Sequence, residues 1–196
     1  MWIHLSRLKL HFTPGFFILL LNLCFVPPWM LLQLLAAALL HEAAHCLFLT
    51  VYKVPIQSFH LTAFGLEITA PLLHLSYPQE LLTLAAGPAV NFFCSLISAA
   101  LQHYFFAGIS LMLCLFNLLP IVPLDGGRIL ECLLCWLWDP VKGDRLCRYI
   151  SGSCAMLFFL FTGIVVWRSH GNLFFLLFAA GLCSMQFPLV KHKRKR

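Results

Sequence analysis

The chain has 196 residues, of which 61% are hydrophobic and 10% charged, and its mean hydropathy is +0.90. These values exclude an ordinary soluble domain and predict an all-α membrane protein that crosses the bilayer several times as a single domain, residues 1–196. The net charge of +6 does not predict a nucleic-acid partner, because the basic residues lie at the ends of apolar runs, where membrane topology accounts for them.

The first apolar run follows a short basic start that contains Arg7 and Lys9. A basic start and an apolar centre are also typical of a signal peptide. No small-x-small cleavage site follows, however, and Pro27-Pro28 leads straight into the next apolar run. We therefore expect an uncleaved first membrane helix over about 12–26, ended by the prolines.

The second apolar run, about 29–52, contains the sequence His41-Glu42-Ala43-Ala44-His45. Residues four apart share one face of a helix, about 5–6 Å apart at Cβ, so both histidines can bind one zinc ion. Glu42 flanks that face and can take the proton of a water molecule on the metal, as the general base of a metallohydrolase. The pattern also arises by chance in soluble helices. Within a membrane helix, a carboxylate costs on the order of 2.5–3.5 kcal/mol, which favours a functional role.

Residues 54–77 change from a helical to a twofold period. Ser58, His60 and Thr62 alternate with apolar residues, and the phase then slips at Ala63-Phe64-Gly65. Alternation by two predicts strands, and the slip predicts a turn between them. We expect a small membrane-associated β-hairpin, which is either an inert connector or an edge that pairs with an extended peptide.

The third helix is expected over about 79–103 and contains Gly87, Pro88 and Asn91. Small residues allow close helix approach, and Pro88 should kink the helix. Asn91 fits a hydrogen bond between helices better than a catalytic role.

The fourth helix, about 107–122, runs into a break that is still apolar. Pro120, Pro123 and the pair Gly126-Gly127 interrupt the helix around Asp125. A surface turn would explain Asp-Gly, but broken backbone at membrane depth is tolerated only where protein or a polar cavity surrounds it. A short helix is expected over about 128–138, followed by a charged cytoplasmic stretch over 139–148. Helices five and six are expected over about 150–167 and 172–189, and a basic cytoplasmic tail over 190–196.

Six helices place both termini on one side of the membrane. Twelve of the 13 Lys and Arg residues then lie on that side, and only Arg168 lies on the other. This asymmetry predicts a multi-pass protein of the plasma membrane with both termini in the cytoplasm. Lys53 and Asp125 fall on the cytoplasmic side, so the active site is expected there.

A catalytic zinc ion needs a third protein ligand. Glu80 and His74 are expected outside the membrane, and His103 at the far end of its helix. His60 and Glu67 remain candidates if the hairpin dips inward. Asp125 alone is expected in a helix break at the right depth, so we predict one zinc ion per chain held by His41, His45 and Asp125.

Three motifs together resemble those of the site-2 protease family of intramembrane zinc metalloproteases: His41-Glu42-x-x-His45, Gly87-Pro88-x-x-Asn91 and Asn117-x-x-Pro120-x-x-Pro123-Leu124-Asp125-Gly126-Gly127. The likeness covers about residues 10–135. It is greatest to the bacterial branch that includes the stage IV sporulation FB protease, but without a PDZ or CBS domain. It implies zinc ligands His41, His45 and Asp125 and catalytic base Glu42.

The resemblance also implies substrate-binding residues. Asn117 is expected beside the active site, where it could polarise the scissile carbonyl, and His60 and Pro123 are further candidates. The expected partners are the lipid bilayer, a membrane-protein substrate such as a transcription-factor precursor or an anti-sigma factor, and a regulatory membrane protein. The substrate should unwind before cleavage, because a membrane helix hides its amides in intrahelical bonds.

Three other functions compete with this interpretation. A transporter or channel would spread its ionisable residues along several helices, whereas here they concentrate in two motifs. A catalytically silent, client-binding relative should lack Glu42 or a ligand, and all four groups are present. A zinc hydrolase of lipid or another non-peptide substrate stays open, because the motif activates water for any electrophile.

Overall fold

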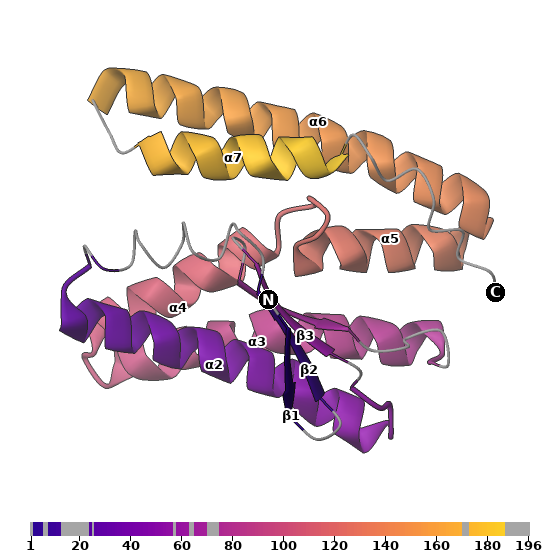
Figure 1. The fold of residues 1–196 in the computed structure, drawn as a ribbon, viewed down its shortest axis with the longest axis horizontal. Coiled ribbons are helices and arrows are strands. Elements are labelled where there is room, and N and C mark those ends of the chain that lie inside the picture. The colour runs from indigo at the N-terminus through magenta and orange to yellow at the C-terminus, as the bar shows by residue number, and fades with distance from the viewer. Residues whose placement is uncertain are drawn as a thin grey trace. The chain divides into compact units, whose positions relative to one another are not determined.

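The computed structural model describes residues 2–5, 8–12, 24, 26–56, 58–62, 65–69, 75–169 and 173–186 (Figure 1). Most of the helix expected over 12–26 lies outside these residues, as does the basic tail 190–196. Phe12 itself belongs to a strand, so the expected start of that helix was wrong. The chain divides into two compact units, Met1–Leu115 and Phe116–Arg196, which are described separately below.

The first unit combines a four-stranded sheet with helices. Its strands are β1 (Trp2–Leu5), β2 (Leu8–Phe12), β3 (Ser58–Thr62) and β4 (Gly65–Thr69), and its helices are α2 (Pro28–Val51), α3 (Tyr77–Ala100) and most of α4 (Tyr104–Asn117). The strand order is β1-β2-β3-β4, with β2 and β3 parallel and the other neighbours antiparallel.

This sheet corrects the all-α expectation. Strands β3 and β4 pair with Ser58 opposite Thr69, and β2 adds a parallel neighbour, so the chain's N-terminal segment joins the sheet. The sequence of β2 alternates Leu8, Leu10 and Phe12 with polar residues, which is the twofold period of a strand. That the sheet is associated with a membrane remains a prediction.

Helix α2 ends in a Schellman turn. Val54 N–H donates to Leu49 O at 2.8 Å and Lys53 N–H donates to Thr50 O at 3.0 Å, while Lys53 adopts a left-handed φ of 56°. Leu49, Val54 and Leu75 then form a small buried cluster. The end of α2 is therefore packed against the segment that leads into α3.

Helix α3 begins with a capping box. Gln79 Oε1 accepts a hydrogen bond from the backbone N–H of Ser76 at 3.0 Å, and Pro78 lies in the first turn, where its missing N–H costs nothing. Helix α3 packs along α2. Its buried residues form a polar stripe at spacings of three and four: Glu80, Thr83, Gly87, Asn91, Ser95 and Ser98.

The second unit is built from α5 (Asp125–Leu137), α6 (Pro140–Ser169) and α7 (Leu173–Gln186). Helix α6 packs against both others and lies beside α7 (Figure 1). The ring of Phe116 contacts Phe158 of α6 and Phe178 of α7, with centroids 6.1 and 5.7 Å apart. This aromatic cluster joins the start of the unit to its two longest elements.

Two expected boundaries were wrong in this region. Helix α4 ends at Asn117 rather than near 122, and α5 begins at Asp125 rather than near 128. The helix expected over about 150–167 begins earlier, because the charged stretch expected in the cytoplasm forms the start of α6 from Pro140 onwards. The carboxylate of Asp139 accepts a hydrogen bond from Val141 N–H at 2.9 Å and so caps α6, and Pro140 occupies its first position.

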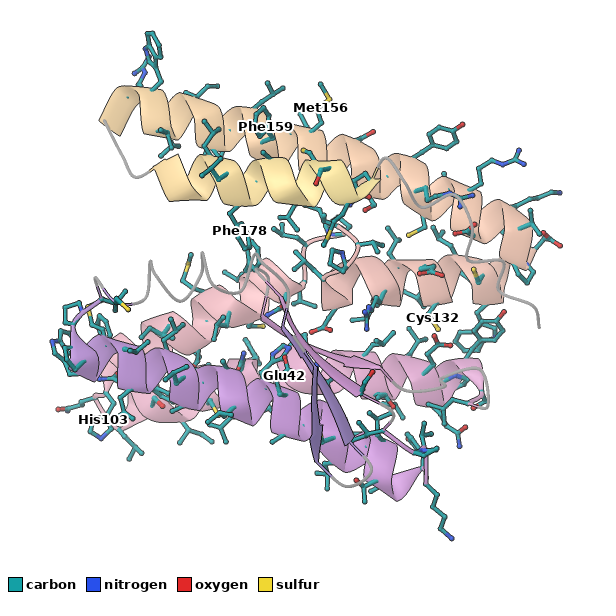
Figure 2. The ribbon with its side chains drawn as sticks, viewed as in Figure 1. Glu42, His103, Cys132, Met156, Phe159 and Phe178 are labelled. Atoms are coloured by element: carbon teal, nitrogen blue, oxygen red, sulfur yellow. The ribbon has the colours of Figure 1, made fainter. Side chains whose placement is uncertain are left out.

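Three described helices, α2, α3 and α6, are long and apolar enough to cross a membrane, and α4 and much of α7 form shorter apolar helices. Large apolar side chains lie exposed along them, including Leu39 at 67% and Met156 at 60%. Figure 2 shows Met156 pointing away from the helix pair α6 and α7. Exposed apolar surface on this scale fits contact with lipid rather than water.

Candidate metal centre

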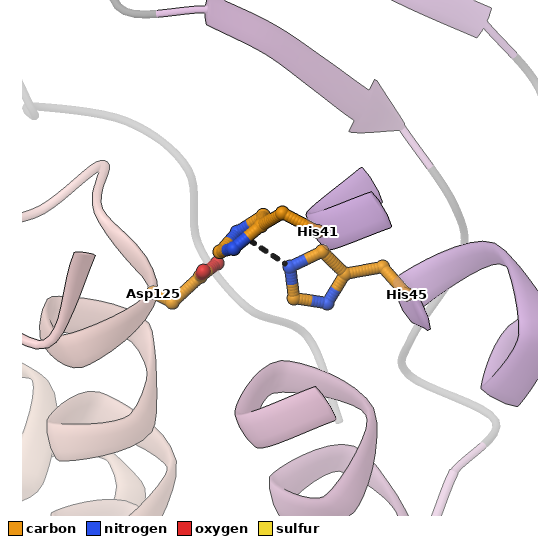
Figure 3. Close-up of side chains that lie close together, drawn as sticks. All are labelled: His41, His45 and Asp125. Atoms are coloured by element: carbon orange, nitrogen blue, oxygen red, sulfur yellow. Dashed lines mark hydrogen bonds between the residues drawn. The ribbon is translucent and has the colours of Figure 1, made fainter. Parts of the chain in front are cut away.

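His41 and His45 are two buried histidines on one face of α2, one helical turn apart. Their Nε2 atoms lie 3.2 Å apart, and the rings are steeply inclined, with an interplanar angle of 76° (Figure 3). Two nitrogen ligands of a tetrahedral zinc ion, each about 2.0–2.1 Å from the metal, would lie about 3.3–3.4 Å apart. The spacing of the two histidines therefore fits a shared metal ion.

The other nitrogen of His45 is held by α3. Its Nδ1–H donates to the backbone carbonyl of Thr83 at 2.8 Å, and this contact is buried. Because a carbonyl oxygen can only accept, the proton of a neutral His45 ring lies on Nδ1 and the lone pair on Nε2. This is the arrangement of a metal-ligating histidine, whose second nitrogen is fixed by an outer partner.

The other nitrogen of His41 is held by Asn91, which is fully buried. The Asn91 side-chain amide contacts His41 Nδ1 at 3.1 Å through Nδ2 and leaves Oδ1 buried without a hydrogen-bond partner among the described residues. If the amide turns by 180°, Oδ1 instead accepts the proton of His41 Nδ1–H. Both histidines would then present Nε2 lone pairs to a metal ion, and the orphaned oxygen would gain a donor.

Gly87 leaves the space in front of these two rings. A Cβ atom at position 87 would lie 2.6 Å from Nε2 of His41 and would also collide with Nε2 of His45. Both colliding atoms are the ones that would bind the metal. One face of α3 therefore provides a hydrogen-bonding partner for each histidine, at Thr83 and Asn91, and the clearance between them.

Glu42 follows His41 on α2 and is half-buried (Figure 2).

Asp125, also drawn in Figure 3, is the first residue of α5. The two glycines after it are required by close backbone packing. A Cβ at Gly126 would lie 2.6 Å from Leu119 O, and a Cβ at Gly127 would lie 2.7 Å from Ile121 O. The preceding segment therefore packs directly on the first turn of α5, and this contact explains the pair Gly126-Gly127.

The remaining predicted residues lie in different elements. Asn117 is the last residue of α4, and Pro123 lies between α4 and α5; both are half-buried. His60 belongs to β3, but its side chain lies outside the described residues. Sequence reasoning missed the role of Thr83, which acts through its backbone carbonyl. The spacing of Gly87 and Asn91 by four residues places both on one face of α3, but a backbone carbonyl leaves no signal in the sequence.

Comparisons with known proteins show similarity to zinc metalloproteases. The model of peptidase family M50 matches residues 98–161. Two curated relatives are the zinc metalloprotease MJ0392 of Methanocaldococcus jannaschii, 29% identical over 140 residues, and Rip3 of Mycobacterium tuberculosis, 34% identical over 118 residues. These matches cover 65% and 52% of this chain, but only 41% and 30% of the relatives. The chain thus spans less than half the length of either relative.

A solved structure matches the fold over almost the whole chain. The site-2 protease from Methanocaldococcus jannaschii aligns with a TM-score of 0.73 and 21% identity, over 95% of this chain and 93% of that one. This likeness shows a shared fold that extends beyond the segment matched by the family model. Residues 98–161 of the chain thus resemble peptidase family M50, and the chain as a whole has the fold of that site-2 protease.

Proposed function

We propose that this protein is an intramembrane zinc metalloprotease that hydrolyses a peptide bond in or near a transmembrane segment of its substrate. The observation that carries the proposal is the buried pair His41 and His45, with Nε2 atoms 3.2 Å apart and each Nδ1 held by α3. A relative named as a zinc metalloprotease and the shared fold support it.

His41, His45 and Asp125 would hold the metal, with one ligand atom each: two imidazole nitrogens and one carboxylate oxygen. This donor set suits zinc, and three protein ligands leave a position for water, as in catalytic zinc sites. The support for Asp125 is its place at the start of α5, directly after a non-helical segment of an otherwise apolar sequence.

When bound, zinc supplies a Lewis acid that polarises a carbonyl group and makes water more acidic. The chain's own residues then perform the proton transfers. Glu42 accepts the proton of the attacking water and returns it to the leaving amine. Thr83 and Asn91 keep both histidine rings oriented during these steps.

The proposed substrate is a membrane-spanning segment that unwinds near the scissile bond. Helix-breaking residues there would favour cleavage, because a regular helix keeps its amides in intrahelical bonds. The edge of β4 offers backbone groups for an extended substrate strand. Asn117, His60 and Pro123 are the proposed substrate contacts, and a membrane protein that restrains the enzyme is a further expected partner.

The proposed topology has six spans, with both termini and the active site towards the cytoplasm. The described helices α2, α3 and α6 are long and apolar enough to form three of these spans, and the shorter apolar helices α4 and α7 are proposed as two more; the sixth expected span lies mostly outside the described residues. The support is the charge asymmetry of the sequence, in which Arg168 alone falls on the opposite side.

The metal content of the purified full chain in detergent tests the ligand assignment. We expect about one zinc ion per chain in the wild type. His41→Ala and Asp125→Ala should lose zinc because each removes a ligand, whereas Glu42→Gln should keep it. The measurement is zinc per protein by elemental analysis.

Zinc retained at the wild-type level in Asp125→Ala would remove Asp125 from the site and return attention to His60 and Glu67. A wild type that binds no zinc when zinc is supplied would refute the protease proposal while leaving the fold unchanged.

Asn91 gives a finer prediction about the same site. Asn91→Leu should weaken zinc binding about 10- to 100-fold, because His41 Nδ1–H would be buried without an acceptor. Asn91→Asp should bind zinc nearly as well as the wild type, since either carboxylate oxygen can accept that proton. Competition with a chelator measures both affinities, and equal affinities for the Leu and Asp variants would contradict the proposed hydrogen bond.

A further inference from the structure

The segment between α4 and α5 is not helical, so its backbone N–H and C=O groups need hydrogen-bond partners other than those of a helix. Pro120 and Pro123 have no N–H to donate, and Ile121 and Leu124 donate within the segment, to Leu119 O at 2.7 Å and Ile121 O at 2.8 Å. In an apolar environment, the remaining N–H and C=O groups need partners from elsewhere in the protein. Val122 is the residue at which such partners are found.

Ser151 of α6 and Gln186 of α7 close a ring of three hydrogen bonds on the backbone of Val122. Val122 N–H donates to Ser151 Oγ at 2.8 Å, and Ser151 Oγ–H donates to Gln186 Oε1 at 2.8 Å. Gln186 Nε2–H completes the ring by donating to Val122 O at 2.6 Å. Ser151 is 1% exposed, so the ring is shielded at its centre. We call these two side chains the Val122 clamp.

The clamp acts on a segment that is in direct contact with the first turn of α5. A Cβ at Gly127 would collide with the backbone nitrogen of Val122, and a Cβ at Gly126 would collide with Leu118 O. The backbone of the segment before α5 is in direct contact with the backbone of its first turn. A shift of Val122 must therefore move that turn, which begins with Asp125.

We propose that Ser151 and Gln186 are positioning residues for Asp125: they hold the Val122 backbone and thereby fix the carboxylate as a metal ligand. This inference rests on the proposed function, which assigns Asp125 to zinc. It gives α6 and α7, which contain none of the proposed ligands, a definite part in the metal centre. Outer groups that orient a ligand typically change metal affinity by about 10- to 100-fold.

A double-mutant cycle on the full chain in detergent tests the proposal, with zinc affinity from chelator competition as the readout. Ser151→Ala should weaken zinc binding about 10- to 100-fold, and Ser151→Thr, which keeps the hydroxyl, should restore it. Asp125→Ala keeps both histidines, so a weak residual zinc affinity can serve as the baseline, and in this background Ser151→Ala should cause no further loss because the group through which the clamp acts is gone.

Two further measurements separate positioning from general stability. Ser153→Ala changes an exposed serine of the same helix and should keep wild-type affinity. The visible absorption of the Co(II)-loaded protein should change in Ser151→Ala and return in Ser151→Thr, since it reports ligand geometry. Gln186→Leu, which opens the ring from α7, repeats the cycle if Ser151→Ala yields no folded protein.

The outcomes distinguish this inference from the proposed function. If Asp125→Ala keeps wild-type affinity, Asp125 is not a ligand and the clamp proposal fails with that assignment. If Asp125→Ala loses zinc but Ser151→Ala does not, only the positioning role is overturned. The same holds if Ser151→Ala weakens binding equally in both backgrounds, since the clamp would then act without Asp125.

Discussion

Glu42→Gln is expected to abolish peptide-bond hydrolysis while leaving the metal centre intact. Glutamine has nearly the same shape as glutamate but cannot accept a proton from the attacking water. General acid–base groups typically contribute about 10²- to 10⁴-fold to a rate, so the loss should be of at least this order. Zinc content should stay at the wild-type level, because His41 and His45 keep both partners on α3.

The measurement is the cleavage rate of a single-span reporter, co-reconstituted with the enzyme in lipid vesicles. The reporter carries helix-breaking residues in its span, and a matched reporter with an uninterrupted polyleucine span should resist cleavage. Wild-type cleavage of the first reporter by Glu42→Gln would remove Glu42 from the mechanism. Equal cleavage of both reporters by the wild type would contradict the proposed unwinding of the substrate.

Gly87→Ala is expected to eliminate zinc binding without unfolding the protein. The added Cβ would lie 2.6 Å from His41 Nε2, well inside van der Waals contact. The colliding atoms are the far ends of two side chains, so the rings can turn away at modest cost. Turning them, however, moves both ligand nitrogens, and we expect zinc affinity to fall by at least about 100-fold.

Gly108→Ala on α4 is the matched control, because nothing lies within 4 Å of a Cβ at that position. Both variants replace a helical glycine by alanine, which on its own favours the helix by about 0.5–1 kcal/mol. Zinc titration with thermal unfolding in detergent gives both readouts. Wild-type zinc affinity in Gly87→Ala would show that the space in front of the histidines is not needed.

Helix α2, which contains His41 and His45, could be predicted from the sequence because its signals are local. Apolar runs, the prolines at 27 and 28 and the polar end at Lys53 placed α2 to within one residue at each end. The partners of the histidines are a different kind of feature. Thr83 contributes a backbone carbonyl that every residue has, so only the packing of α3 on α2 selects it.

Two other features of the fold, the start of α6 and the first two strands, were not predicted correctly. The charged residues of 139–148 led us to place the start of the next helix near 150, yet Asp139 followed by Pro140 is a helix start. Strand β2 pairs with β3, a neighbour far along the chain, and β1 pairs with β2; a short segment by itself offers little evidence of such pairing.

The turn that ends α2 has a consequence for how the histidine helix is oriented. Lys53 takes a left-handed conformation that costs a residue with a side chain about 1–2 kcal/mol and that glycine adopts freely. A lysine there keeps a positive charge beside the last carbonyls of α2, where a cation is favourable, and resists transfer across the bilayer. In the proposed topology, the backbone strain at Lys53 is therefore offset by a positive charge that favours insertion of α2 with this end towards the cytoplasm.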